Sequence, residues 1–371
     1  MLLIDQLELT PSQTIILREV HRATTASRVD LSRITGLSTQ SLTRITKQLI
    51  DMGILVEGER RINGRGQPAI HLSISPSRFV SFGIVIEHDQ ITCVAVEMCG
   101  EQILYLKRRG NYMCAKDALS EAQFMLSTAV SQAPKNSYAL GVGISVSGFF
   151  YKEASRKFIS YNDPNGWRKI DLTKDLKMPI NMPIIVENDG RSAAIGQAID
   201  GVGRNLDSFF LILMTQDVGG GFVHKGDLIR GQLGNAGEVG EFVPRGPSAI
   251  RPTTESLEKF LKNKFGTMLS DLEIEKALLH KDKIIYEWVE GAAESLKPAL
   301  SAITKLLDPY AIILAGRLLP SLREAVASKI KIDGLSFQGL SAPTPRIIVD
   351  PRTDNPCLGA SALPVALFLY N

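Results

Sequence analysis

Two polar segments carry the side chains best suited to hydrogen-bond a ligand rich in hydroxyl groups. The first is Glu187-Asn188-Asp189, which follows the apolar run 183–186 and precedes an alanine-rich stretch. The second contains Asn235 and ends in Glu238. Carboxylates and amides suit such a ligand because every hydroxyl both donates and accepts hydrogen bonds. An Asn-Asp pair between a strand and a helix is also an ordinary helix N-cap, and this alternative stays open.

Three adjacent glycines lie between these two segments. They are Gly219, Gly220 and Gly221. They follow Asp217 and the apolar run 209–214, which reads as a buried strand. We expect a turn here, because glycine lets a backbone approach another group closely. The N–H groups of such a loop can face a phosphate, although a plain hairpin turn is the alternative.

The three segments together resemble the sugar-kinase domain of the ROK family (repressors, open reading frames and kinases). That family has an END-x-x-A-A segment, a G-x-G-G-G turn and a G-x-x-G-E-x-G-H segment. Here the segments read ENDGRSAA from 187, GGG from 219 and GNAGEVGE from 234, in the same order. The resemblance implies a two-lobed actin-like (ribonuclease H-like) α/β fold over residues 76–371. This domain would bind a ligand in a cleft near residues 187–241 and would form the dimer.

The resemblance also implies which residues meet the ligand. Residues 162–167 resemble an N-x-x-G-W loop whose Asn meets the sugar in the family, although they also form a good turn sequence. Carried over position by position, the implied ligand-binding residues are Asn162, Asn188, Asp189, Glu238, Glu241 and Glu258. The last four would make an acidic cluster, which favours a ligand with an amine or raises the pKa of one carboxylate.

The chain departs from the family where the kinases bind ATP. The kinases have D-x-G-G-T in their first turn, where the Asp organises Mg²⁺ and the glycines admit the phosphates. Val85 stands in place of that Asp, and Glu87-His88-Asp89 replaces G-G-T with an acidic turn that repels phosphate. In the family's second phosphate turn, Gln216 and Asp217 replace small residues. The segment 307–316 lies under adenosine in the kinases, but here it can have a purely structural role. We therefore expect no ATP, no other cofactor and no catalytic residue.

The family's zinc site is also altered in this sequence. Its His position falls on Glu241, and its cysteine positions fall on Ala249, Arg251 and Ser256. Without a thiolate or an imidazole, tetrahedral coordination by nitrogen and sulfur cannot form. We expect no metal.

The first seventy-five residues predict a winged helix–turn–helix. Helices are expected over 10–22, 28–35 and 39–53, with Gly36-Leu37-Ser38 as the turn before the third. That helix buries one apolar face and presents polar and basic residues that suit a DNA major groove. A hairpin, with strands near 54–56 and 69–74, forms the wing, whose tip could enter a minor groove. The expected DNA-binding residues are Ser38, Thr39, Gln40, Ser41, Thr43, Arg44, Lys47 and Arg65. A small helical bundle with a solvated face is the alternative, and the wing argues against it.

Composition sets further limits on the class of protein. The 371 residues allow two or three domains, 44% are hydrophobic, and the net charge of +3 neither requires nor excludes nucleic acid. The four cysteines have no metal or redox spacing, and the first residues lack the basic segment of a signal peptide. We expect a cytoplasmic protein that does not enter a membrane.

We interpret the chain as a transcriptional regulator, and most readily as a repressor of carbohydrate genes. Residues 1–75 would bind operator DNA, and residues 76–371 would sense a small carbohydrate effector. Two-fold dimers read palindromic half-sites, so we expect a homodimer, which could pair into a tetramer. The alternatives are an active ROK-type sugar kinase with an added DNA-binding domain and a regulator that needs no ligand.

Overall fold

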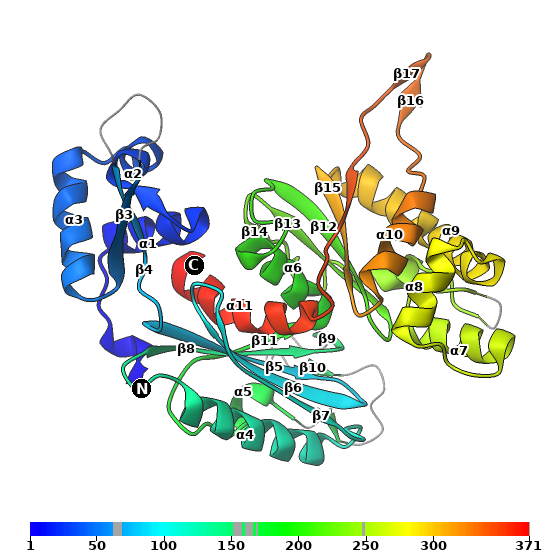
Figure 1. Ribbon diagram of the computed structural model, residues 1–371, viewed down its shortest axis with the longest axis horizontal. Helices are drawn as coiled ribbons and strands as arrows, with labels where there is room; N and C mark the ends of the chain where they lie inside the picture. The colour runs from blue at the N-terminus through cyan, green and yellow to red at the C-terminus, as the bar shows by residue number, and fades with distance from the viewer. Residues whose placement is uncertain (62–68, 151–157, 160–165, 168–169, 247–248, 371) are drawn as a thin grey trace. The chain divides into compact units, whose positions relative to one another are not determined.

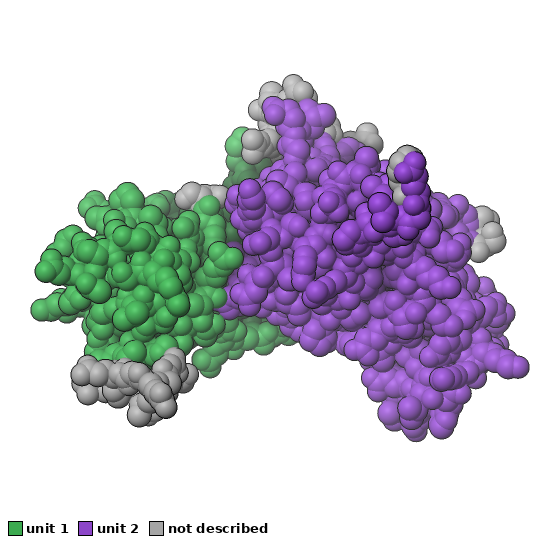
Figure 2. Space-filling model, turned by 90° about the horizontal axis from the view of Figure 1, so that it is seen from above, with its two compact units in different colours: residues 1–144, 164–186, 360–371 green, residues 145–163, 187–359 purple. Residues whose placement is uncertain are grey.

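The computed structural model describes the chain except for residues 62–68, 151–157, 160–165, 168–169, 247–248 and 371. The chain divides into two compact units, coloured separately in Figure 2. Unit 1 comprises Met1–Ile144, Pro164–Val186 and Ala360–Asn371, and unit 2 comprises Ser145–Asp163 and Glu187–Gly359. The expected boundary between residues 75 and 76 lies inside unit 1, and it remains a prediction.

The N-terminal part of unit 1 contains helices and a small sheet. Its elements are β1 (Leu2–Leu3), a short 3-10 helix (Ile4–Gln6), α1 (Pro11–Ala23), β2 (Ala26–Ser27), α2 (Arg28–Thr35), α3 (Thr39–Asp51), β3 (Leu55–Arg61) and β4 (Ala69–Ile74). Strands β2, β4 and β3 form an antiparallel sheet in that order. Leu17 of α1, Leu31 of α2 and Leu42 of α3 are fully buried, so the apolar stripes of the three helices make one core.

The boundaries of these helices follow from their capping residues. Thr10 accepts a hydrogen bond from the N–H of Gln13, and Ser38 accepts one from the N–H of Ser41. Gly36 ends α2 in the left-handed conformation, with φ of 71°. The predicted helices and the turn between the second and third are therefore confirmed.

A six-stranded sheet lies mainly in unit 1 and has the order β1-β8-β5-β6-β7, with β11 also paired to β8. Its larger strands are β5 (Phe79–Ile86), β6 (Gln90–Glu97), β7 (Gln102–Arg109), β8 (Tyr138–Val146) and β11 (Ile184–Asn188). Helices α4 (Ala115–Gln132) and α11 (Asn355–Tyr370) cover its opposite faces, as Figure 1 shows. Helix α11 packs closely on the strands, and glycine at position 83 makes room for it. A Cβ on Gly83 would come within 2.7 Å of the Ser361 nitrogen.

A five-stranded sheet forms the centre of unit 2, with the order β14-β13-β12-β15-β18. Its strands are β12 (Ser208–Met214), β13 (Val218–His224), β14 (Asp227–Leu228), β15 (Ala311–Gly316) and β18 (Arg346–Val349). Helix α6 (Asp189–Asp200) packs on one face, where Leu211 meets Ala193 and Ala194. Ile212 faces the larger core on the other side, which includes Trp288. The helices after β14 are α7 (Thr254–Phe265), α8 (Asp271–Leu279), α9 (Lys283–Leu307) and α10 (Pro320–Lys329).

The remaining elements are short. They are β9 (Phe149–Phe150), β10 (Phe158–Ile159), α5 (Leu172–Asp175), a 3-10 helix (Val239–Phe242), β16 (Ser336–Phe337) and β17 (Leu340–Ser341). Among the residues that the structure describes, no helix combines the length and apolar character needed to cross a membrane.

The prediction of a glycine turn at Gly219, Gly220 and Gly221 is wrong. All three lie inside β13 and pair with β12, and the turn is formed by residues 215–217. The reason is the close packing of α6 on this strand, since a Cβ on Gly190 would lie 2.3 Å from the Gly220 nitrogen. A Cβ on Gly221 would likewise lie 2.7 Å from that of Ala194. The glycines therefore let α6 pack closely against β13.

Candidate functional site

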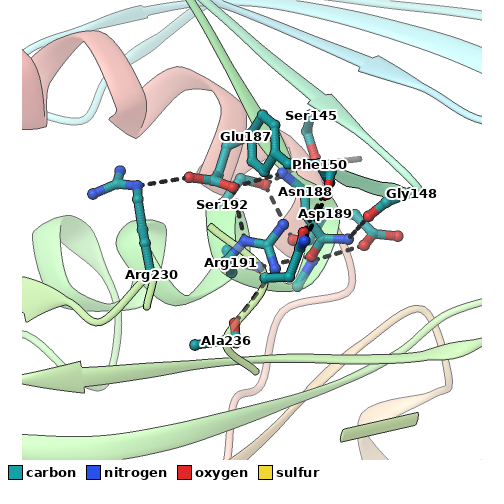
Figure 3. A network of polar contacts seen from close by, with 12 residues as sticks. Ser145, Gly148, Phe150, Glu187, Asn188, Asp189, Arg191, Ser192, Arg230 and Ala236 are labelled. Carbon is teal, nitrogen blue, oxygen red and sulfur yellow. Dashed lines mark hydrogen bonds and ion pairs between the residues drawn. The ribbon is translucent and has the colours of Figure 1, made fainter. Parts of the chain in front are cut away.

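The start of α6 organises the first candidate site, which lies in unit 2 (Figure 3). The Asn188 side chain accepts hydrogen bonds from the N–H groups of Gly190 (2.9 Å) and Arg191 (3.2 Å). Its amide nitrogen donates to the carbonyl of Gly148 at 2.9 Å. The N-cap alternative is therefore what the structure shows, and a contact between Asn188 and a ligand remains a prediction.

A buried ion pair that the sequence reasoning missed lies beside this cap. Arg191 donates to Glu187 at 2.8 Å, and it pairs with Glu238 at 3.2 Å. Arg230 donates to the second oxygen of Glu187 at 2.9 Å. The signal in the sequence was weak: Arg191 is a charged residue among small ones, four positions after Glu187.

Asp189 is half-buried at the first position of α6, and one of its oxygens accepts from the N–H of Gly190 at 2.8 Å. Burial raises the pKa of Asp189, while that N–H opposes the increase. The charge of Glu238 raises the pKa further, and the guanidinium of Arg191 lowers it. The raised pKa of Asp189 thus comes chiefly from burial rather than from the expected cluster of four carboxylates, of which only Glu238 contributes.

Glu238 lies near Asp189, in a loop that hydrogen bonds from Asn235 hold in place. The Asn235 amide donates to the Phe150 carbonyl at 2.6 Å and accepts from the Phe150 N–H at 2.8 Å. The ring of Phe150 also lies 5.7 Å from the Arg191 guanidinium carbon, in a cation–π contact. Asn188, Asp189 and Glu238 thus meet at one place, as predicted, but arginines balance the charge of the acidic residues.

A second ionic network includes Glu241 and Arg251, which stand at two of the family's zinc-ligand positions. Glu241 pairs with Arg245 at 3.2 Å, and Arg245 reaches Asp217 at 3.2 Å. Arg251 also donates to Asp217, and to the carbonyl of Val243 at 2.6 Å. These residues do not fit a zinc ion, because arginines already bind the carboxylates. Within the described ranges, no group of three or more His, Cys, Asp or Glu side chains could hold a metal.

Two predicted ligand residues lie apart from this site. Glu258 is exposed on α7 and has no hydrogen bond or ion pair to any described residue. Asn162 lies outside the described residues. The ligand roles of Glu241 and Glu258 remain predictions.

The exposed face of α3 is the second candidate site. Leu42, Ile45 and Leu49 are buried against the rest of unit 1, so the opposite side of the helix faces solvent. Ser41 is half-buried, and the other predicted residues are exposed: Ser38, Thr39, Gln40, Thr43, Arg44 and Lys47. Arg65 lies outside the described residues.

Arg28 fixes the position of α3, and the sequence reasoning missed it. Its Nε donates to the hydroxyl of Thr46 in α3 at 2.9 Å, and its Nη2 donates to Glu57 of β3 at 2.8 Å. The linker residue Arg78 donates to the carbonyl of Met52, just after α3, at 3.0 Å. The C-terminal half of α3 is therefore tied to neighbouring elements by two arginines.

Known proteins resemble this chain over nearly its whole length. The xylose repressor of Bacillus subtilis is 24% identical over 382 residues, covering 96% of both chains. The Escherichia coli regulator NagC is 20% identical over 366 residues, covering 91% of this chain and 88% of its own.

Solved structures give the same fold. A ROK family transcriptional regulator, a homologue of E. coli Mlc, superposes with a TM-score of 0.65 at 18% identity over 96% of this chain and 97% of its own. A ROK glucokinase from Streptomyces griseus, solved with glucose and AMPPNP, gives 0.56 at 20% identity over 76% of this chain and 98% of its own. The ROK family pattern matches residues 81–364, which is most of the sequence, and the chain therefore belongs to the ROK family.

Proposed function

We propose that this protein is a DNA-binding transcriptional regulator, a repressor of carbohydrate genes that senses a sugar or a close derivative. The observation that carries the proposal is the exposed polar and basic face of α3, whose C-terminal half is held by Arg28 and Arg78. The resemblance to repressors supports it, because the xylose repressor match covers 96% of this chain whereas the glucokinase covers 76%.

Residues 1–75 act as the winged helix–turn–helix in this proposal. Helix α2, the turn at Gly36 and helix α3 have the order that places a second helix in a major groove. Arg44 and Lys47 reach base edges or phosphates, and the wing between β3 and β4 adds Arg65. A homodimer, which could pair into a tetramer, presents two such helices to a palindromic operator.

Residues 76–371 act as the sensor. Asp189 and Glu238 accept hydrogen bonds from sugar hydroxyls, and Arg191 orients Glu238 through an ion pair of 3.2 Å. The effector changes operator affinity only if it binds the DNA-competent and incompetent states unequally.

Three features speak against a kinase. Val85 is buried where the kinases have the Asp that organises Mg²⁺. In the turn that follows it, the Glu87 N–H is already bonded to the Gln90 carbonyl at 3.0 Å. The third feature is the turn at Gly316, whose N–H donates to the Asn355 side chain at 2.6 Å. Backbone donors that could face a nucleotide are thus used within the chain.

Two assays test the proposal. Selection of genomic DNA fragments followed by footprinting identifies the operator, and a thermal-shift screen with D-xylose, N-acetylglucosamine and D-glucose, each with and without ATP, identifies the effector. A regulator binds a defined palindrome and gains thermal stability with one sugar whether or not ATP is present. Sugar phosphorylation with ATP would establish the kinase alternative, and operator binding without any sugar response would establish the ligand-independent regulator. Failure to select any DNA would overturn the proposal.

A further inference from the structure

Helix α11 belongs to both units, because its residues up to Gly359 lie in unit 2 and those from Ala360 lie in unit 1. The helix contains no charged residue and is buried at most of its positions. It is one continuous element that begins beside the candidate ligand site and ends beside the N-terminal helices.

The first turn of α11 is fixed to α6. Asn355 donates to Asp350 at 2.5 Å, and Asp350 accepts in turn from Gln197 of α6. The backbones also touch, since a Cβ on Gly359 would lie 2.4 Å from the carbonyl carbon of Ser192. Ser192 is three residues beyond Asp189, and its hydroxyl donates to the Asp189 carbonyl at 3.1 Å. A displacement at the start of α6 therefore cannot leave the start of α11 in place.

The rest of α11 is fixed to the sheet of unit 1. A Cβ on Gly143 would lie 1.9 Å from the Ala360 carbonyl oxygen, so helix and strand are in backbone contact. The hydroxyl of Ser81 donates to the Ser361 carbonyl at 2.5 Å. Farther along, the Phe368 ring lies 5.4 Å from that of Phe79.

The last turn of α11 contacts α1. The Tyr370 hydroxyl lies 3.4 Å from Nδ1 of His21, which is buried, and the two rings meet edge to face. Helix α1 contacts both α2 and α3. A displacement of α11 thus reaches the helices that carry the proposed DNA-binding face.

We infer that α11 is the element through which the ligand site in unit 2 controls the DNA-binding helices of unit 1. The inference rests on the proposed function for the meaning of the two ends, but the physical coupling does not depend on it. Close backbone packing transmits a displacement, because cores switch between discrete arrangements rather than deform smoothly.

Amide hydrogen exchange on the full chain tests the coupling without DNA or sugar. The variant Gly359→Ala inserts a methyl group between α11 and α6, far from α1 in sequence. If α11 couples the two sites, exchange of the α1 amides rises by about two- to thirtyfold, the range expected for such coupling energies. The matched control is Gly291→Ala in α9, whose methyl would meet the side chain of Ile250, with Cδ1 at 2.7 Å and Cβ at 2.9 Å, and no backbone atom among its three nearest neighbours. It should leave α1 unchanged.

A reverse experiment decides the matter if Gly359→Ala does not fold. Coupling is reciprocal, so Tyr370→Phe, which removes the hydroxyl facing His21, should raise exchange in α6. Tyr310→Phe, which alters a partly exposed tyrosine of unit 2, is its control. Changes confined to α6 and the first turn of α11 in Gly359→Ala, or an unchanged α6 in Tyr370→Phe, would overturn the inference. Because neither DNA nor sugar is present, a failure of the proposed function would show separately, as absent operator binding.

Discussion

The Nε of Arg191 lies 2.8 Å from an oxygen of Glu187, and the two side chains are 0% and 3% exposed. Removing one partner of a buried pair leaves an uncompensated charge, which costs far more than the pair gains. We expect Arg191→Ala to lower the free energy of unfolding by about 3–5 kcal/mol, measured by urea denaturation.

Arg230→Gln is the control for this prediction. Arg230 binds the same Glu187, but it is 48% exposed, so its loss should cost less than about 1 kcal/mol. If the two substitutions lowered the free energy of unfolding equally, the prediction that the buried pair contributes more to stability would be wrong.

The raised pKa of Asp189 predicts a pH-dependent stability. A carboxyl whose pKa is higher in the folded than in the unfolded chain stabilises the fold below its ordinary value of 3.8. That contribution is lost as the pH rises through the folded pKa. The Asp189→Asn variant should therefore gain stability relative to the unaltered protein across this interval, measured by urea unfolding at a series of pH values. Asp227→Asn, at an exposed position, is the control, and a constant difference between Asp189→Asn and the unaltered protein would contradict the prediction.

Asp189 also permits a test of sensing. A hydrogen bond to a charged group contributes on the order of 1.5–3 kcal/mol, so Asp189→Ala should weaken effector binding about ten- to a hundredfold. The variant should still bind the operator, because the DNA-binding helices lie elsewhere in the chain. Calorimetry with the identified sugar and operator titration measure the two properties. A response at the same effector concentration as the unaltered protein would remove Asp189 from the site.

The face of α3 should dominate operator recognition. Arg44→Ala is expected to cost roughly 1–3 kcal/mol if Arg44 meets a base edge. Lys47→Ala should instead weaken binding to all sequences and lower the salt slope by about 0.9 if Lys47 contacts a phosphate. Arg33→Ala, on α2 and also exposed, is the control in a salt-controlled shift assay. Unchanged binding by both α3 variants would exclude this docking. Arg65→Ala should also weaken binding, through the wing.

The contact between α6 and β13 should not tolerate a methyl group. In Gly190→Ala the added Cβ would lie 2.3 Å from the Gly220 nitrogen, so one backbone must move. Overpacking of this kind costs about 1–3 kcal/mol. Gly58→Ala, whose Cβ would meet its nearest neighbour at 3.4 Å, is the control in thermal unfolding. A variant Gly190→Ala as stable as the control would show that the helix shifts freely.

The sequence predicted elements well where local signals and burial agree. The predicted helix 28–35 matches α2, because capping residues mark its ends, and the apolar run 209–214 lies in β12 as the expected buried strand. The three glycines of β13 were wrongly predicted to form a turn, because a run of glycines is typical of turns. Glycine is needed here for another reason, which is the close approach of α6. Only the tertiary structure contains that cause.

The candidate site was predicted in part for a similar reason. Asp189 and Glu238 come together as expected, since the resemblance placed both segments at one site. The arginines that neutralise the site could not be placed, because Arg230 and Arg191 are separated by thirty-eight intervening residues and meet through Glu187. Glu258 was placed with them by resemblance alone, and its exposure on α7 gives that role no support.

The division of unit 1 into three separate stretches of chain has a consequence for synthesis. Proteins emerge from the ribosome N-terminus first, and domains normally fold in that order. Here the sheet of unit 1 is covered by residues 360–370, which are made after residues 187–359 of unit 2 and which contact His21 through Tyr370. A nascent chain therefore exposes the Phe79 face of this sheet until α11 has been made. Truncated products that contain all of α1, α2 and α3 should accordingly be substrates for chaperones and proteases rather than competitors for the operator.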